Sequence, residues 1–330
     1  ASAADTFAWA ALPTGATGAR NLLFNGGMQV AQRGASFVAG ANNDASYNLD
    51  RWLLLSEGND IVDITQQTAE LPDGAYSKMR LDVETADKSF GIAQILETRD
   101  TVPLQGQKVS LRVDMRYKTA WESSRIQIAI LQWTGTADSP TKDVVSSWSA
   151  DGEHTYATNW ASANTPSDIT LTTSWVTTKI ENITISSSAT NVAVFIYTKT
   201  RDGLTVGNLL EITNVQLQRG TYATDFQSRS FSEELALCQR YYAKRDREMI
   251  FSYKATTSSG NRRIGNTIGF PQEMRAEPTV TYANKTETKA TIDDPPNNVS
   301  AGGFDFSGTE ATTGTGNMNI AAAWTADAEF

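Results

Sequence analysis

Tryptophans in polar surroundings are the residues of this 330-residue chain best suited to binding chemistry, and the chain has eight of them. A tryptophan ring stacks on the C–H face of a sugar, while amide, carboxylate and guanidinium groups hydrogen-bond its hydroxyls. Trp121, Trp148 and Trp160 lie in or beside stretches rich in Ser, Thr, Asn and Asp, which predict loops. Because loops on a rigid scaffold often carry recognition residues, we expect these three tryptophans to bind glycan.

Trp133 is the first candidate, because it ends a segment at 125–133 in which apolar and polar residues alternate. In a strand this alternation puts Trp133 on the side of Arg125 and Gln127, opposite the isoleucines of the segment. We therefore expect Trp133, Arg125 and Gln127 to face away from the core and to contact glycan.

The alternative to glycan contact, for every aromatic residue, is a place in the core, since buried rings dominate β-sheet interiors. Trp52 and Trp175 lie beside apolar neighbours, and we expect both in the core. Cys238 is the only cysteine, so no intrachain disulfide can form, and we expect it to be a small buried hydrophobe.

Catalytic patterns are sparse. His154 is the only histidine, which excludes clusters of histidine ligands and HExxH-type zinc sites, and we expect it in a solvated loop. Paired carboxylates such as Asp60 with Asp63, or Asp293 with Asp294, are the type that cleaves glycosidic bonds. Neighbouring acids in turns are usually only solvated. We therefore expect no catalytic residue, no metal site and no cofactor, and keep glycan cleavage as an alternative.

Charge and hydropathy exclude two classes of partner. The formal net charge is −9 and the isoelectric point is about 4.8, so the surface repels phosphate backbones and nucleic-acid binding is not expected. No window approaches the roughly 18 consecutive apolar residues of a transmembrane helix, so no membrane insertion is expected.

The elements that must position these residues are mostly strands. Residues 111–118 alternate strictly between apolar and polar, which predicts a strand with one buried and one wet face. Residues 192–197 are apolar on both faces and predict a central strand. About eight such strands fit between residues 21 and 219, which favours a jelly-roll β-sandwich.

A short helix and further strands follow. Ser230 and Glu233 have capping-box spacing, which predicts a helix that begins near residue 231 and extends to residue 246. Strand patterns return from residue 247 to the end, enough for a smaller β-sandwich that is marginal if left alone. The expected fold class is therefore all-β.

Five strings, in this order, resemble tail and appendage proteins of tailed bacteriophages. They are NLLFNGGMQVAQRG at 21–34, YNLDRW at 47–52, ITNVQLQRG at 212–220, ELALCQRYY at 234–242 and FPQEMRAEPTV at 270–280. Residues 21–220 are also similar to jelly-roll carbohydrate-binding modules of families 4 and 9, which implies a glycan site on a concave β face or its edge loops. Where those modules often carry an acidic calcium ligand, this chain has Asn214, so we expect no bound calcium.

We expect four parts: an N-terminal arm at 1–20, a carbohydrate-binding-type jelly roll at 21–230, a linking helix at 231–246 and a C-terminal β-sandwich at 247–330. A disordered leader is the alternative to the arm. The resemblance implies a virion structural protein, a tail fibre, spike or adhesin subunit made in the host cytoplasm, that attaches to host cell-surface glycan. A homotrimer is expected, with the arm contacting other virion proteins. The alternatives are a capsid decoration or baseplate protein without glycan binding, and a glycan-depolymerising tailspike.

Overall fold

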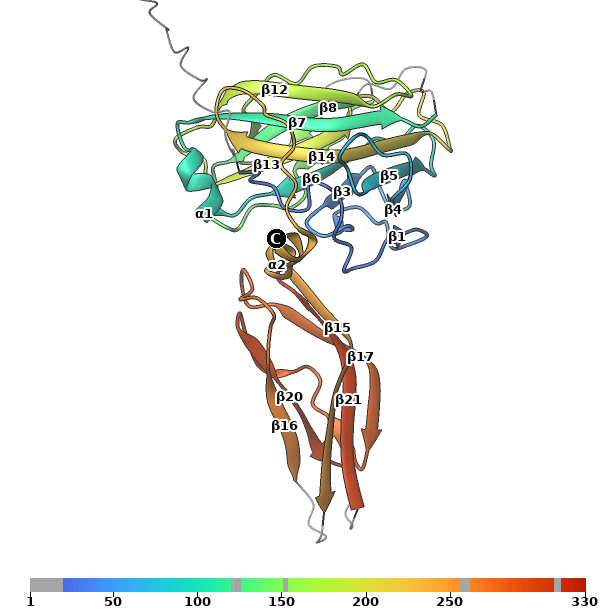
Figure 1. Cartoon of the computed structure of the whole chain (residues 1–330), viewed down its shortest axis with the longest axis vertical. Helices are drawn as coiled ribbons and strands as arrows, with labels where there is room; N and C mark the ends of the chain where they lie inside the picture. The colour runs from blue at the N-terminus through green and yellow to red at the C-terminus, as the bar shows by residue number, and fades with distance from the viewer. Residues whose placement is uncertain (1–19, 120, 122–125, 151–153, 256–261, 312–315) are drawn as a thin grey trace, which may run out of the picture. The chain divides into compact units, whose positions relative to one another are not determined.

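The computed structural model describes residues 20–119, 121, 126–150, 154–255, 262–311 and 316–330, so all of the predicted arm except Arg20 lies outside the described residues. The chain forms two compact units (Figure 1). The sandwich unit comprises Leu53–Ser228, Phe37–Ser46 and the described residues up to Met28. The C-terminal unit comprises Arg229–Phe330 together with Gln29–Ser36 and Tyr47–Trp52.

Two six-stranded sheets form the sandwich unit. The strand order in sheet A is β1 (Ser36–Phe37), β4 (Val62–Gln67), β5 (Lys78–Val83), β14 (Leu209–Arg219), β7 (Lys108–Tyr117) and β12 (Val176–Thr184). The order in sheet B is β11 (Trp160–Ser162), β8 (Ile126–Trp133), β13 (Asn191–Thr198), β6 (Phe90–Ile95), β3 (Leu53–Ser56) and β2 (Ser46–Tyr47). The remaining elements are the hairpin β9 (Val145–Ser147) and β10 (Thr155–Tyr156) and the short helices α1 (Thr98–Thr101) and η1 (Val102–Leu104).

The core of the sandwich unit follows from the alternation of its strands. Val113 of β7 and Ile212 of β14 are fully buried, as is Val194 of β13. Each such side chain contributes about 1.5–3 kcal/mol of hydrophobic stabilisation. All of β13 is buried, as predicted for a central strand, and β8 and β6 pair with its two edges.

The C-terminal unit consists of helix α2 (Phe231–Gln239) and two small sheets. One sheet has the order β15 (Tyr242–Ala255), β21 (Gly316–Asp327) and β17 (Thr279–Thr288). The other has the order β16 (Arg263–Gly269), β20 (Gly303–Glu310) and β18 (Ala290–Ile292), and β19 (Asn297–Ser300) also pairs with β20. Phe304, Ile320 and Trp324 lie in its core. The predicted fold class, an all-β jelly-roll sandwich followed by a short helix and a smaller C-terminal sandwich, is confirmed.

Helix α2 begins as predicted but ends earlier. The Ser230 side chain accepts a hydrogen bond from the Glu233 amide, so the predicted N-cap is confirmed. The prediction that the helix extends to residue 246 is wrong, because from Tyr242 the chain pairs with β21, where Tyr242 lies opposite Asp327. Within the described ranges, no helix has the length and hydropathy needed to cross a membrane.

Two predictions about buried residues are confirmed in the C-terminal unit. Trp52 and Cys238 both have no exposed surface. Burial raises the pKa of the Cys238 thiol well above its usual value, so this cysteine stays a neutral, unreactive core residue.

Candidate functional site

The outer face of sheet B, on the side away from the core between the sheets, is covered by the chain that follows β8. The Trp160 ring lies 5.4 Å from the Trp133 ring, measured between centroids. The Trp148 ring lies 6.2 Å from that of Phe195 on β13. Trp148 lies over sheet B, whereas Trp160 belongs to β11 of sheet B itself and packs beside Trp133 on the same face. Both contacts cover this face, so it does not offer an open surface to a ligand.

The expected exposure of Trp133 is therefore wrong, although its side of β8 is as predicted. Trp133 is 5% exposed because Trp160, opposite it on the paired strand β11, packs against its ring and because Gly135 also packs against the ring, where an added Cβ would lie 2.4 Å from it. The indole nitrogen of Trp133 donates to the carbonyl of Thr136 at 3.0 Å. Local alternation does not show which side chain of a paired strand packs against the ring.

The structure does not bring the other predicted residues onto an open surface either. Trp160, Trp121 and Gln127 are 5%, 8% and 2% exposed, and Trp148 is half-buried. Arg125 lies outside the described residues. Contact of these side chains with glycan stays a prediction, but the buried ones present neither a ring face nor an amide to solvent.

His154 is buried rather than solvated, so this prediction is wrong. Its Nδ1 accepts a hydrogen bond from the Ser149 amide at 2.9 Å, which makes Nε2 the protonated nitrogen that donates to the Thr198 carbonyl at 2.8 Å. Burial lowers the pKa of His154 and favours the neutral ring. With both nitrogens bound to the main chain, His154 holds the covering layer together.

Of the two carboxylate pairs considered in the sequence, Asp60 with Asp63 contains one carboxyl group whose pKa is unusual. The Asn42 amide donates to both Asp60 and Asp63, at 3.1 and 2.9 Å. Burial, with three carboxylates nearby, raises the pKa of Asp63 to about 6, which suits a general acid and keeps glycan cleavage open to test. Asp293 and Asp294 instead pair with two different cations.

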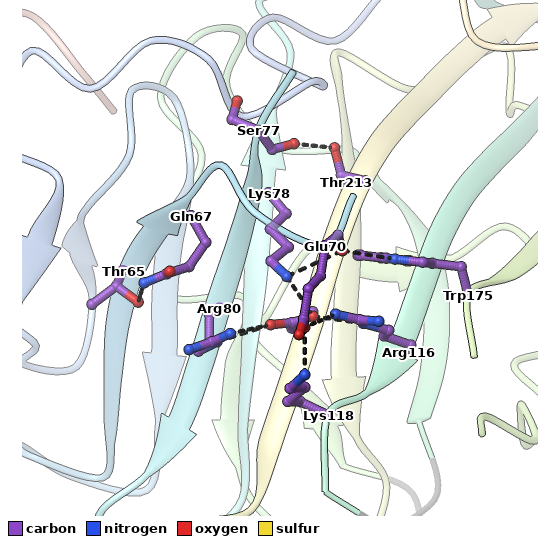
Figure 2. A network of polar contacts seen from close by, with 11 residues as sticks. Thr65, Gln67, Glu70, Ser77, Lys78, Arg80, Arg116, Lys118, Trp175 and Thr213 are labelled. Carbon is purple, nitrogen blue, oxygen red and sulfur yellow. Dashed lines mark hydrogen bonds and ion pairs between the residues drawn. The ribbon is translucent and has the colours of Figure 1, made fainter. Parts of the chain in front are cut away.

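The outer face of sheet A carries polar side chains aligned across its strands (Figure 2). One row, here called the Glu211 row, runs through Thr65, Arg80, Glu211 and Arg116, each opposite the next on the neighbouring strand. Trp175 directly precedes β12 and continues the row, with its ring centroid 4.8 Å from the Arg116 guanidinium carbon. Residues directly opposite each other on paired strands point to the same face of the sheet, so the register of these strands produces the alignment.

Glu211 is the fully buried centre of the row. Its Oε1 accepts from Nε and Nη2 of Arg80 at 2.9 and 2.7 Å, and its Oε2 accepts from Lys78 at 2.8 Å and from Arg116 at 2.7 Å. Burial alone would raise the pKa of Glu211, but the hydrogen bonds from its three cations lower it below the ordinary value. The same burial lowers the pKa of Lys78. The network fixes the positions of both arginines on the face.

Glu70 and Trp175 lie over this network (Figure 2). The Trp175 indole nitrogen donates to the Glu70 carbonyl at 3.1 Å, and the Glu70 carboxylate accepts from Arg116 Nη2 at 2.8 Å. Lys118 pairs with the same carboxylate. Trp175 is partly exposed, so its predicted core position is wrong: it precedes an edge strand and its indole lies over the polar face.

Arg80, Glu211 and Arg116 are not among the site residues predicted from the sequence, because those predictions rest on tryptophans in loops and in the strand at 125–133. A signal was present: the alternation at 111–118 already put Arg116 on the wet face of its strand. The cross-strand alignment of Arg80, Glu211 and Arg116 depends on register, which the sequence does not show.

A polar hollow of about 570 Å³ lies in the C-terminal unit, on β16, β19 and β20. Asp305 in its lining accepts from Thr267 at 2.7 Å and from Asn298 at 2.6 Å. None of the residues that line it is aromatic. The hollow lacks a stacking surface for a sugar ring, so the Glu211 row is the stronger candidate site.

No metal centre emerges from the part of the chain that the structure describes, in which no three His, Cys, Asp or Glu side chains gather around one point. Asn214, at the place of the acidic residue of the resembled modules, is buried and its amide donates to Asp114 at 2.8 Å.

No protein-family model matches the chain, and no curated protein matches its sequence. Among solved structures, TmCBM61 in complex with β-1,4-galactotriose is 15% identical over 61% of this chain and 99% of its own, with a TM-score of 0.33. The family 11 carbohydrate-binding module of Clostridium thermocellum, in complex with a mixed-linked tetrasaccharide, is 12% identical over 55% and 95%, with a TM-score of 0.31. The enzymatically active domain of bacteriophage CBA120 tailspike protein 4 is 13% identical over 56% of this chain but only 22% of its own, with a TM-score of 0.34. These values are too low to support a functional conclusion.

Proposed function

We propose that the chain is a non-enzymatic adhesion subunit of a tailed bacteriophage particle, which binds host cell-surface glycan through the outer face of sheet A. The Glu211 row carries this proposal. It places a partly exposed tryptophan against Arg116 on the outer face of sheet A, in a row whose second arginine, Arg80, is held by the same buried glutamate.

The row offers the two kinds of contact that a saccharide needs. The indole of Trp175 is an apolar surface for a sugar ring, and its NH bond to Glu70 fixes its position. Arg80 and Arg116 have guanidinium donors held in place by Glu211, so little side-chain entropy is lost when they bind a hydroxyl or an acidic group.

Repetition of the site would compensate for weak single contacts. We propose a homotrimer, since linked sites raise avidity by about 10²–10⁴ without any new contact. The resemblance of the strings at 21–34, 47–52, 212–220, 234–242 and 270–280 to phage appendage proteins supports a place in the virion, with the arm at 1–20 contacting other virion proteins.

The test is an array of bacterial capsular and lipopolysaccharide glycans, followed by binding of the intact chain to cells of a strain that carries the best glycan. We expect binding that disappears when the surface polysaccharide is stripped enzymatically. Equal binding to intact and stripped cells would show that the receptor is not glycan.

A purely structural role, as a capsid decoration or baseplate component, is the second candidate. The burial of Trp121, Trp133 and Trp160 favours it, because these rings then serve the fold alone. An empty array together with an image that places the chain away from host-contacting appendages would support it. A depolymerase would instead release reducing ends from the bound polysaccharide, which we do not expect.

A further inference from the structure

Glu70 lies on the loop between β4 and β5 and brings its carboxylate onto the outer face of sheet A (Figure 2). The carboxylate binds Arg116 and Lys118, and the Glu70 carbonyl accepts from Lys78 at 3.3 Å and from the Trp175 indole. The backbone φ of Glu70 is 53°, a left-handed conformation that is unfavourable for residues other than glycine. These contacts therefore hold the loop in place over the row.

The two carboxylates of the network differ in accessibility. Glu211 is fully buried among its three cations, whereas the Glu70 side chain is 52% exposed. Direct ion pairs link four cationic side chains to two carboxylates. The cations are Lys78, Arg80, Arg116 and Lys118, and the carboxylates are Glu70 and Glu211. The network is thus positively charged, in a chain whose net charge is −9.

We propose that Glu70 occupies the position of a ligand carboxylate, and that the glycan bound here is a polysaccharide containing uronic or sialic acid. This inference rests on the proposed glycan-binding function. The carboxylate of the incoming sugar displaces the Glu70 side chain and accepts hydrogen bonds from Arg116 and Lys118, beside the ring of Trp175.

Exchange of one carboxylate for another leaves the charge balance of the network unchanged. A neutral sugar that displaced Glu70 would leave Lys118 without the carboxylate it pairs with. It would also leave Arg116, which is largely buried, with Glu211 as its one remaining carboxylate in the network, which is unfavourable. Hydrogen bonds from Lys118 and Arg116 lower the pKa of Glu70 to about 2, so at neutral pH the internal competitor is itself charged. A ligand carboxylate therefore replaces the Glu70 carboxylate without loss of charge pairing, whereas a neutral ligand does not.

The experiment compares four acidic polysaccharides, polygalacturonate, hyaluronan, alginate and polysialic acid, with their carboxyl-reduced forms. The dissociation constant is measured for the wild-type chain, Glu70→Ala, Glu70→Gln and Lys118→Gln. Glu84→Gln is the matched control, because Glu84 is an exposed glutamate of the sandwich unit outside the network.

We expect the wild-type chain to prefer at least one acidic polysaccharide over its reduced form. Both Glu70 variants should bind it about two- to fivefold more tightly, because the weak, partly exposed ion pairs of Glu70 with Arg116 and Lys118 no longer compete. Lys118→Gln should weaken binding, and Glu84→Gln should change nothing. Equal affinity for acidic and reduced forms, or unchanged affinity in Glu70 variants with an unchanged unfolding midpoint, would overturn the inference. If the chain binds only neutral glycans, and does so through Trp175, the inference fails but the proposed function stands. If it binds no glycan, the inference and the proposed function both fail.

Discussion

The guanidinium carbon of Arg51 lies 3.5 Å from the centroid of the Tyr241 ring, inside the C-terminal unit. Arg51 also pairs with Glu329, and both side chains are almost fully buried. Burial raises the pKa of Glu329, although Arg51 and Arg33 act in the opposite direction. Three segments far apart in the sequence thus meet at one buried ion pair.

Arg51→Ala should destabilise the C-terminal unit by about 3–5 kcal/mol, because Glu329 is left as a buried charge without its main partner. Urea unfolding measures this change. Lys285→Ala is the control in the same unit, since it removes a partly exposed pair with Asp294 and should cost less than about 1 kcal/mol. Equal losses in the free energy of unfolding would show that the buried pair stabilises the unit no more than the partly exposed pair does.

Trp133→Ala should lower stability without a specific effect on glycan binding. The ring is buried under Trp160 and the Gly135 backbone, so its loss leaves a cavity that costs about 3–5 kcal/mol. The free energy of unfolding and the glycan affinity, both measured at a temperature where the variant stays folded, separate the two effects. Weaker binding with unchanged stability would restore Trp133 as a ligand residue.

Glu211→Gln should be less stable than the wild type at pH 7, by a margin that shrinks in acid. The pKa of Glu211 is lower in the folded state than its ordinary value of 4.5. Between these two values the unfolded chain binds a proton that the folded chain does not, so lowering the pH favours unfolding. This stabilisation is fully present above about pH 4.5 and is lost as the pH falls through the folded pKa.

Unfolding midpoints of both proteins from pH 7 to pH 2 test this expectation. The difference between them should narrow below about pH 4.5. A difference that is constant or grows with acid would contradict the lowered pKa. Lys199→Ala, which removes an exposed pair with Asp168 in the same unit, provides the control for charge removal.

Local patterns in the sequence predicted the strands well, because alternation and burial are properties of each strand by itself. The segment at 111–118 lies almost wholly within β7, and 192–197 lies in the fully buried β13. The start of α2 was also predictable, since the Ser230 cap involves residues only three apart.

The candidate site depends on long-range arrangement that no local pattern contains. Trp133 faces the predicted side of its strand, yet it is buried because Trp160 of the paired strand β11 packs against its ring. Trp175 has apolar neighbours in the sequence but lies over Arg116, because it precedes an edge strand. The cross-strand register that aligns Arg80 with Glu211 could not be predicted from the sequence either.

A calorimetric titration of the intact chain with its best glycan tests the central claim most directly. Trp175→Ala should weaken binding about tenfold with little change in unfolding midpoint, while Phe231→Ala, which removes an exposed aromatic ring of the C-terminal unit, should bind like the wild type. Unchanged affinity of a folded Trp175→Ala variant would contradict glycan binding through the outer face of sheet A.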